Sequence, residues 1–246
     1  MFSVNVFHTP EELGAAAAGR IACEINKAIA RQGYCRIALS TGASQFETLK
    51  ALVKLDVDWS KVTMFHLDEY VDLPETHAAS FRKYLKERFV DIVHPKEAVF
   101  VNGEGDVRGH IAELTKRITE KPIDVGVIGI GENGHVAFND PPADFQTKAS
   151  YIVVDLDRKC RMQQVHEGWF KTVDDVPKQA VSMTVSQIMS CKVIVTAAPH
   201  AVKADAIQMT MEKPVTNLVP ATILKSHPEW YLFIDDDSSA KAFPVR

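Results

Sequence analysis

Apolar residues along this chain gather in short runs that alternate with segments of helical periodicity. The runs are rich in Val, Ile and aromatic residues and end at polar residues or glycines, which is typical of buried strands. Apolar residues three or four positions apart predict helices between several runs, for example over 81–90 and 111–118. This alternation predicts an α/β fold with a mainly parallel, doubly wound sheet and helices on both faces. The strands are predicted at YCRIALS, KVTMFHL, AVFV, IDVGVIG, YIVVDL, KVIVTAA and WYLFI.

The first helix carries start and stop signals in its sequence. Thr9 is placed as its N-cap, Pro10 takes the first helical position, and Glu12 can complete a capping box. Gly33 follows the last helical residue, where a glycine commonly ends a helix. The sequence has no internal repeat, low-complexity tract or Gly/Ser linker. The whole chain, 1–246, is therefore predicted to form one domain.

Composition argues against several classes of function. With a net charge of −4 and no basic run interleaved with aromatic residues, the chain is not expected to bind nucleic acid. No apolar run could span a bilayer and the N-terminus does not resemble a signal peptide, so we expect a cytoplasmic protein with no membrane partner. The cysteines form no C-x-x-C pair, which favours reduced thiols over a disulfide framework or a zinc site. They are Cys23, Cys35, Cys160 and Cys191.

Polar residues that follow the predicted strands are candidates for a ligand site, because ligands of such sheets bind beyond the carboxyl ends of the strands. After YCRIAL comes a turn of small residues that leads into a predicted helix over 45–52. Backbone N–H groups and hydroxyls there would suit an anion, although an ordinary capped turn has the same composition. The candidate anion-binding residues are Thr41, Gly42, Ala43 and Ser44.

Two further strand ends carry ionisable residues. Asp68 and Glu69 follow KVTMFHL, where a carboxylate is costly unless it is paired or used. Either could be a general base, and either could be a turn acid that accepts from backbone N–H groups. Lys203 lies near the start of the helical segment after KVIVTAAP, where it could pair with an anion or be an ordinary solvated lysine.

The run IDVGVIGIG leads into GENGHVAFNDPP, and Gly129, Gly131 and Gly134 have the spacing G-x-G-x-x-G. A dinucleotide-binding loop with this spacing opens a helix, and here two prolines follow too soon for one. We therefore interpret the glycines as bringing the backbone and His135 close to a small ligand. Asp140 is near enough in sequence to orient the imidazole, and such a pair can transfer protons near pH 7.

These strand ends together suit proton transfer on a phosphorylated small molecule. Their motifs resemble those of the glucosamine-6-phosphate deaminase (isomerase) family, which is related to 6-phosphogluconolactonase. LSTGAS is similar to the phosphate loop of that family, and TMFHLDEYVDLP to its F-x-x-DEYVGLP segment. GIGENGHVAFNDP is similar to its GH…FNEP signature, and VPKQAVSMTV to its VPK-x-ALT segment. The likeness runs in order over most of the chain.

The resemblance implies a Rossmann-like fold and conversion of glucosamine 6-phosphate and water into fructose 6-phosphate and ammonia, with no cofactor and no metal. It implies that His135 opens the sugar ring with the help of Asp140, and that Asp68 moves a proton from C2 to C1. The phosphate is expected to bind at 41–44 and to Lys203. The other expected site residues are Asn133, Glu69 and Gly134.

The chain departs from the family pattern in three places. Asn133 stands where the family often has an aspartate, and Asp140 replaces a longer glutamate. A family arginine that grips the phosphate has no equivalent at 167–170, and Arg161 is the nearest cationic substitute. Activation by a second phosphate is not expected, because the basic residues that bind it in some oligomeric members are replaced around Ala143, Ser150 and Ile152.

Three alternative functions are compatible with these motifs. A deaminase acting on another amino-sugar phosphate, such as galactosamine 6-phosphate, would account for the missing arginine. A 6-phosphogluconolactonase would share the phosphate loop and the GH loop, but it lacks the DEYV form. A non-catalytic sugar-phosphate sensor normally carries a DNA-binding helix pair first, whereas the likeness here begins near residue 10. A homo-oligomer is compatible with the sequence as well.

Overall fold

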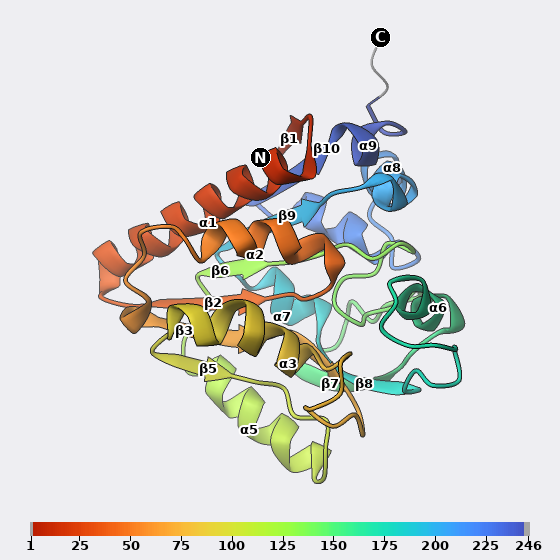
Figure 1. The fold of residues 1–246 in the computed structure, drawn as a ribbon, viewed down its shortest axis with the longest axis horizontal. Coiled ribbons are helices and arrows are strands. Elements are labelled where there is room, and N and C mark those ends of the chain that lie inside the picture. The colour runs from red at the N-terminus through yellow and green to blue at the C-terminus, as the bar shows by residue number, and fades with distance from the viewer. Residues whose placement is uncertain (1, 244–246) are drawn as a thin grey trace.

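The computed structural model describes residues 2–243, and its centre is a seven-stranded sheet in which every pair of neighbours is parallel (Figure 1). The predicted α/β class with a parallel, doubly wound sheet is confirmed. Between β2 and β6 the order of the strands reverses, so the loops after these strands open a crevice at the carboxyl edge. In pairing order the strands are β1 (Ser3–Phe7), β10 (Trp230–Asp235), β9 (Val193–Ala198), β6 (Val125–Val127), β2 (Cys35–Leu39), β3 (Val62–His66) and β5 (Glu97–Val99).

Helices cover both faces of this sheet, and each face has its own hydrophobic core. One core joins Leu13, Leu49 and Tyr84 to the sheet, and these residues come from α1 (Pro10–Gln32), α2 (Phe46–Leu52) and α3 (Phe81–Leu85). The other core joins Leu114, Ile188 and Ile207 to the opposite face, and these come from α5 (Val107–Thr119), α7 (Val185–Met189) and α8 (Ala204–Glu212). Burial of these apolar side chains fixes the strand ends that carry the polar residues.

The boundaries of α1 follow its sequence signals. Thr9 Oγ1 accepts a hydrogen bond from Glu12 N at 3.2 Å, and Pro10 is the first helical residue. Gly33 ends the helix in the left-handed region, with φ 81°, and its N–H donates to the carbonyl of Ile29. The second half of the predicted capping box is wrong, because Glu12 Oε2 accepts from His8 N, one residue before the cap. The start and the end of the helix are confirmed.

A second, three-stranded antiparallel sheet lies beside the carboxyl edge of the first. It consists of β4 (Asp68–Tyr70), β8 (Gln179–Met183) and β7 (Tyr151–Asp155). The run YIVVDL is therefore a strand, but its expected place in the parallel sheet is wrong. Its burial alternates along the strand because one face of β7 is open to solvent. Only Leu67 separates β3 from β4, so Asp68 lies where the chain passes from one sheet to the other.

Several elements were not expected from the sequence, among them β1, β8 and α6 (Arg158–His166). β1 is an edge strand and β8 contains Gln179 and Ser182, so neither has a continuous apolar run. α6 is a mostly polar helix, and two of its residues, Gln163 and Gln164, line the pocket described below. The remaining elements are α4 (Asp91–Val93), α9 (Asp236–Ser239), a π-helical turn (Lys86–Val90) and 3₁₀ turns at Ala43–Gln45, Trp59–Lys61, Ala201–Lys203 and Pro220–Ser226.

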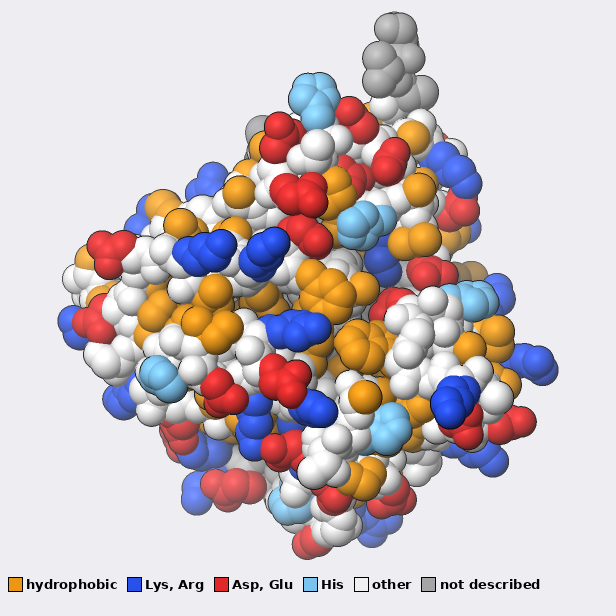
Figure 2. All heavy atoms as spheres, viewed as in Figure 1, with side chains coloured by type: hydrophobic (Ala, Val, Ile, Leu, Met, Phe, Trp, Pro, Cys, Tyr) orange, Lys and Arg blue, Asp and Glu red, His pale blue; other side chains and the backbone are white. Residues whose placement is uncertain are grey.

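The surface shows no field of a single charge sign on the face drawn in Figure 2, where acidic and basic side chains are mixed. Among the described residues, none of the helices has the length and apolar character that crossing a membrane requires.

Candidate active site

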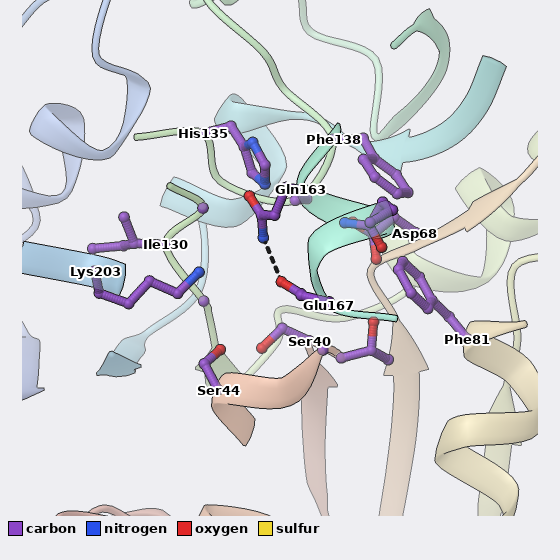
Figure 3. Close-up of a pocket in the computed structure, with 16 residues that line it drawn as sticks. Ser40, Ser44, Asp68, Phe81, Ile130, His135, Phe138, Gln163, Glu167 and Lys203 are labelled. Carbon is purple, nitrogen blue, oxygen red and sulfur yellow. Dashed lines mark hydrogen bonds between the residues drawn. The ribbon is translucent and has the colours of Figure 1, made fainter. Parts of the chain in front are cut away.

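A pocket lies at the carboxyl edge of the parallel sheet, where the strand ends with polar residues meet (Figure 3). Its walls come from the turn after β2, the junction of β3 and β4, the glycine loop after β6, the turn after β9, and helix α6. The residues that line it are Ser40, Thr41, Gly42, Ser44, Asp68, Phe81, Gly129, Ile130, Gly131, His135, Ala137, Phe138, Gln163, Gln164, Glu167 and Lys203.

One end of the pocket combines a buried lysine with hydroxyl-bearing residues and a glycine turn. Thr41, Gly42 and Ser44 line it, and Gly42 has φ 97°, a conformation that favours glycine. The side chain of Lys203 points into this end (Figure 3), and the residue is only 5% exposed. Burial lowers the pKa of Lys203, while the charges of Glu167 and Glu132 act in the opposite direction. Its ammonium has no hydrogen bond or ion pair to any residue between 2 and 243, which is costly for a buried cation.

The glycine loop makes room for His135. A Cβ added to Gly131 would lie 2.2 Å from Nε2 of that histidine, so only glycine lets the ring pack here. Gly134 has φ 83°, and this turn sends the chain back so that the imidazole faces the pocket (Figure 3). Gly129, Gly131 and His135 all line the pocket, and the expectation that this loop brings the backbone and His135 close to a small ligand stays a prediction.

His135 is held from behind by acidic and amide groups. Its Nδ1 lies 3.1 Å from Asp140 Oδ1, and the two side chains are 10% and 7% exposed. Asn133 donates to Asp140 Oδ1 at 3.0 Å and accepts from the backbone N–H of His135 at 3.0 Å. The backbone N–H of Asp157 donates to Asp140 Oδ2 at 3.3 Å. Burial opposes ionisation of Asp140, but its contacts with His135 and Asn133 outweigh burial and lower its pKa.

Cys160 lies close to His135 and Asp140. The ligand atoms of His135, Asp140 and Cys160 lie within 4.8 Å of one another, which is the kind of spacing a metal ion needs. Burial raises the pKa of Cys160 well above its usual range, and the nearby Asp140 raises it further. The side chain is therefore a neutral thiol near pH 7.

Asp68 lies across the pocket from Lys203, with the rings of Phe81 and Phe138 beside it (Figure 3). Burial, and then the charge of Glu69, raise the pKa of Asp68 to about 8. Its carboxylate has no hydrogen-bond partner in the described part of the chain, and it lines the pocket together with Phe81 and Phe138. Such a carboxyl group can both take up and release a proton near neutral pH.

Glu69 lies on the opposite side of β4 and is fully buried. Its Oε2 accepts from Ser80 Oγ at 2.8 Å and from Arg82 N at 2.8 Å, and it pairs with the Arg82 guanidinium at 3.3 Å. Strand alternation explains the difference, because neighbouring side chains point to opposite faces. The structure therefore places Asp68, and not Glu69, on the pocket.

Besides Asn133 and Asp140, which lie behind His135, three other expected site residues lie off the pocket wall. Ala43 and Gly134 belong to the right loops but do not line the cavity. Arg161 also does not line it, and its guanidinium donates to the carbonyl of Val173 at 3.4 Å. Gln163 and Gln164 of α6 and its C-cap residue Glu167 line the pocket, whereas Arg161 projects from a different face of the helix. The expected substitution of Arg161 for the missing arginine has no support in this placement.

Sequence reasoning missed the rings of Phe81 and Phe138 and the polar side chains on and directly after α6. Gln163 Nε2 donates to Glu167 Oε1 at 2.7 Å, and Gln163 Oε1 accepts from Glu132 N at 3.1 Å, so α6 is tied to the glycine loop. Gln164 accepts from the hydroxyl of Tyr70 at 2.8 Å. The spacing of these residues on α6 is a helical signal, but no apolar periodicity accompanied it.

Comparison with known proteins adds to this geometry. The family described as "Glucosamine-6-phosphate isomerases/6-phosphogluconolactonase" matches residues 8–232. A glucosamine-6-phosphate deaminase of Streptococcus equi subsp. zooepidemicus (strain MGCS10565) is 34% identical over 224 residues, which are 91% of this chain and 94% of that protein. The protein of the same name from Streptococcus sanguinis (strain SK36) is 34% identical over 221 residues, or 89% of this chain and 92% of that protein.

Solved structures are similar over nearly the whole chain. That of a monomeric glucosamine-6-phosphate deaminase has a TM-score of 0.89 at 26% identity, covering 97% of this chain and 99% of that one. A putative 6-phosphogluconolactonase from Neisseria gonorrhoeae has a TM-score of 0.77 at 19% identity, covering 96% and 100%. The second likeness concerns the fold alone.

Proposed function

We propose, since this chain belongs to the family of glucosamine-6-phosphate isomerases and 6-phosphogluconolactonases, that it converts glucosamine 6-phosphate and water into fructose 6-phosphate and ammonia. The observation that carries this proposal is the placement of Lys203 and Asp68 across one pocket. Lys203 is a buried cation without a partner in residues 2–243, and Asp68 is a buried carboxyl group. An open-chain sugar phosphate has its anion and its reactive carbons at opposite ends, and it matches this arrangement.

The phosphate on C6 binds at the end of the pocket formed by Thr41, Gly42, Ser44 and Lys203. Lys203 supplies the charge, and the turn supplies hydroxyl and backbone N–H donors. This contact is remote from the reacting carbons, so its binding energy orients C1 and C2 toward Asp68 and His135.

His135 opens the ring of the sugar. It takes the proton of the anomeric hydroxyl and gives a proton to the ring oxygen, so the C1–O5 bond breaks and the aldehyde forms. Asp140 supports this step, because a carboxylate 3.1 Å from Nδ1 stabilises the imidazolium that forms in between. Asn133 in turn holds Asp140 through its 3.0 Å hydrogen bond.

Asp68 then moves the proton along the chain. It removes the proton from C2, the aldehyde oxygen gains a proton from the substrate's own ammonium group, and a neutral enolamine forms. Asp68 returns its proton to C1, which leaves an iminium group at C2. Water adds to C2 and ammonia leaves, so the overall reaction consumes one water and yields the ketone. A group with a pKa of about 8 suits both transfers.

The test is to incubate the purified protein with glucosamine 6-phosphate and to assay ammonia and ketose phosphate together. We expect equal amounts of both products, and no product from unphosphorylated glucosamine. Galactosamine 6-phosphate serves as the epimeric substrate, and 6-phosphogluconolactone as the substrate of the related hydrolase. Lactone hydrolysis without ammonia release from either amino sugar contradicts the proposal.

A further inference from the structure

Glu167 brings a second carboxylate into the pocket, and the reaction above gives it no task. It follows directly after α6 and lies between Lys203 and Asp68 in the view of Figure 3. Beside a phosphate, a carboxylate weakens binding by repulsion, so a glutamate here works against the anion end of the pocket. Its presence calls for a contact with another part of the ligand.

The carboxylate of Glu167 is fixed by two donors. Oε1 accepts from Gln163 Nε2 at 2.7 Å, and Oε2 accepts from the indole N–H of Trp169 at 3.0 Å. Gln163 is itself anchored to the backbone of Glu132 at 3.1 Å. Each carboxylate oxygen can accept a further hydrogen bond. The side chain therefore presents preorganised acceptors in a defined direction, and a fixed acceptor can distinguish the orientation of a hydroxyl group.

The position of Glu167 along the pocket identifies the part of the ligand that it meets. In the proposed function, the C6 phosphate lies at Lys203 and C2 lies at Asp68. The carbons between them carry only hydroxyl groups, and C4 is in the middle. Inversion at C4 moves its hydroxyl to the other side of the chain, away from an acceptor that cannot follow.

We propose that Glu167 accepts a hydrogen bond from the C4 hydroxyl of the sugar chain and thereby selects the gluco over the galacto configuration. This role rests on the proposed function only for the identity of the ligand as a six-carbon sugar phosphate. Glu167 is then a specificity-determining residue that contacts the substrate without taking part in proton transfer.

Binding of D-glucitol 6-phosphate and D-galactitol 6-phosphate tests this role by titration calorimetry. Both are open chains that differ at C4, and neither has the aldehyde or the amine that reaction requires. We expect the wild type to prefer the gluco form by about tenfold or more, as a charged hydrogen bond provides. In Glu167→Gln the ratio of the two dissociation constants should fall by about threefold or more, because a neutral amide oxygen accepts a weaker hydrogen bond than a carboxylate.

The ratio of the two dissociation constants separates recognition of the C4 hydroxyl from general effects of charge and folding. Glu167→Gln removes a negative charge near Lys203, which strengthens binding of both phosphates alike. Glu132→Gln is the matched control, because Glu132 also acts on the charge of Lys203 but does not line the pocket. We expect it to change both affinities and to leave their ratio intact. In Trp169→Phe the carboxylate stays but loses its indole donor, and the ratio should fall only in part.

Several outcomes overturn this role. They are a wild type that binds the two hexitol phosphates equally or not at all, and a Glu167→Gln protein that folds and keeps the wild-type ratio. The role is also overturned if Glu167→Gln keeps its affinity for both hexitol phosphates and only binds amine-bearing sugars more weakly. That result would place Glu167 at the ammonium group of the substrate. Selection between the hexitols without ammonia release from glucosamine 6-phosphate would contradict the deaminase proposal and leave the role of Glu167 standing.

Discussion

Gly131→Ala should disable ring opening while leaving the rest of the pocket in place. The new Cβ would lie 2.2 Å from His135 Nε2 and 2.3 Å from Cε1. Ordinary contact between such atoms begins near 3.5 Å, so the imidazole must move by roughly 1 Å. The backbone of Gly131 is not in the left-handed region, so alanine clashes with the imidazole of His135 but does not strain its own backbone.

A displacement of about 1 Å at a proton-transfer group costs on the order of 10²-fold in rate. We therefore expect kcat/KM for glucosamine 6-phosphate to fall by about that factor, measured by coupled ammonia release. Binding of D-glucitol 6-phosphate should stay within about twofold, because that ligand has no ring to open and its phosphate site is untouched.

Gly129→Ala is the matched control in the same loop. Its Cβ would lie 3.4 Å from the terminal nitrogen of Gln45, which is close to ordinary contact. We expect a much smaller loss of activity in this variant. Wild-type-like turnover in a folded Gly131→Ala protein would refute the argument from packing, as would equal losses in the two variants.

Three further results are expected. In Lys203→Met, loss of the charged contact should raise KM by about 10-fold to 100-fold and abolish competition by inorganic phosphate. Lys203→Arg should give a KM between those of the wild type and Lys203→Met, and an unchanged KM in Lys203→Met would remove Lys203 from the phosphate site. Asp68 must be ionised to take the C2 proton and its pKa is raised to about 8, so kcat/KM should increase with pH up to about 8; a plateau already reached at pH 6 would contradict this. Glu69→Ala leaves the buried guanidinium of Arg82 with less charge compensation, so the free energy of unfolding should drop by about 3–5 kcal/mol in denaturant titrations. The folded fraction should keep its activity. Loss of activity at unchanged stability would reverse the roles of Glu69 and Asp68.

The sequence was most informative where a local signal acts alone. Thr9, Pro10 and Gly33 set the ends of α1 through capping geometry, which depends on a few neighbouring residues. Continuous apolar runs identified the buried central strands, because parallel strands are covered on both faces. β1 and β8 lack such runs, and the place of YIVVDL in a second sheet depends on contacts between segments distant in the sequence.

Candidate site residues could be predicted from the sequence where they directly follow a predicted strand. Asp68, His135 and Lys203 follow apolar runs, and the structure brings all three to one pocket. The choice between Asp68 and Glu69 required the alternation of β4, because the two residues are adjacent and both are acidic. The sequence did not show that Glu167 and not Arg161 faces the pocket. That depends on how α6 is rotated about its axis, and a mostly polar helix has no apolar face from which its orientation could be predicted.

Transfer of the C2 hydrogen is the most direct test of the central claim, that Asp68 carries a proton in an amino-sugar isomerisation. Glucosamine 6-phosphate is incubated in deuterated water, and NMR follows exchange at C2 of the substrate and deuterium at C1 of the ketose product. The wild type should incorporate deuterium from solvent or transfer the C2 hydrogen to C1. Asp68→Asn should bind D-glucitol 6-phosphate but lose exchange and turnover by at least about 10²-fold to 10⁴-fold. Exchange and turnover at the wild-type rate in Asp68→Asn would contradict the account.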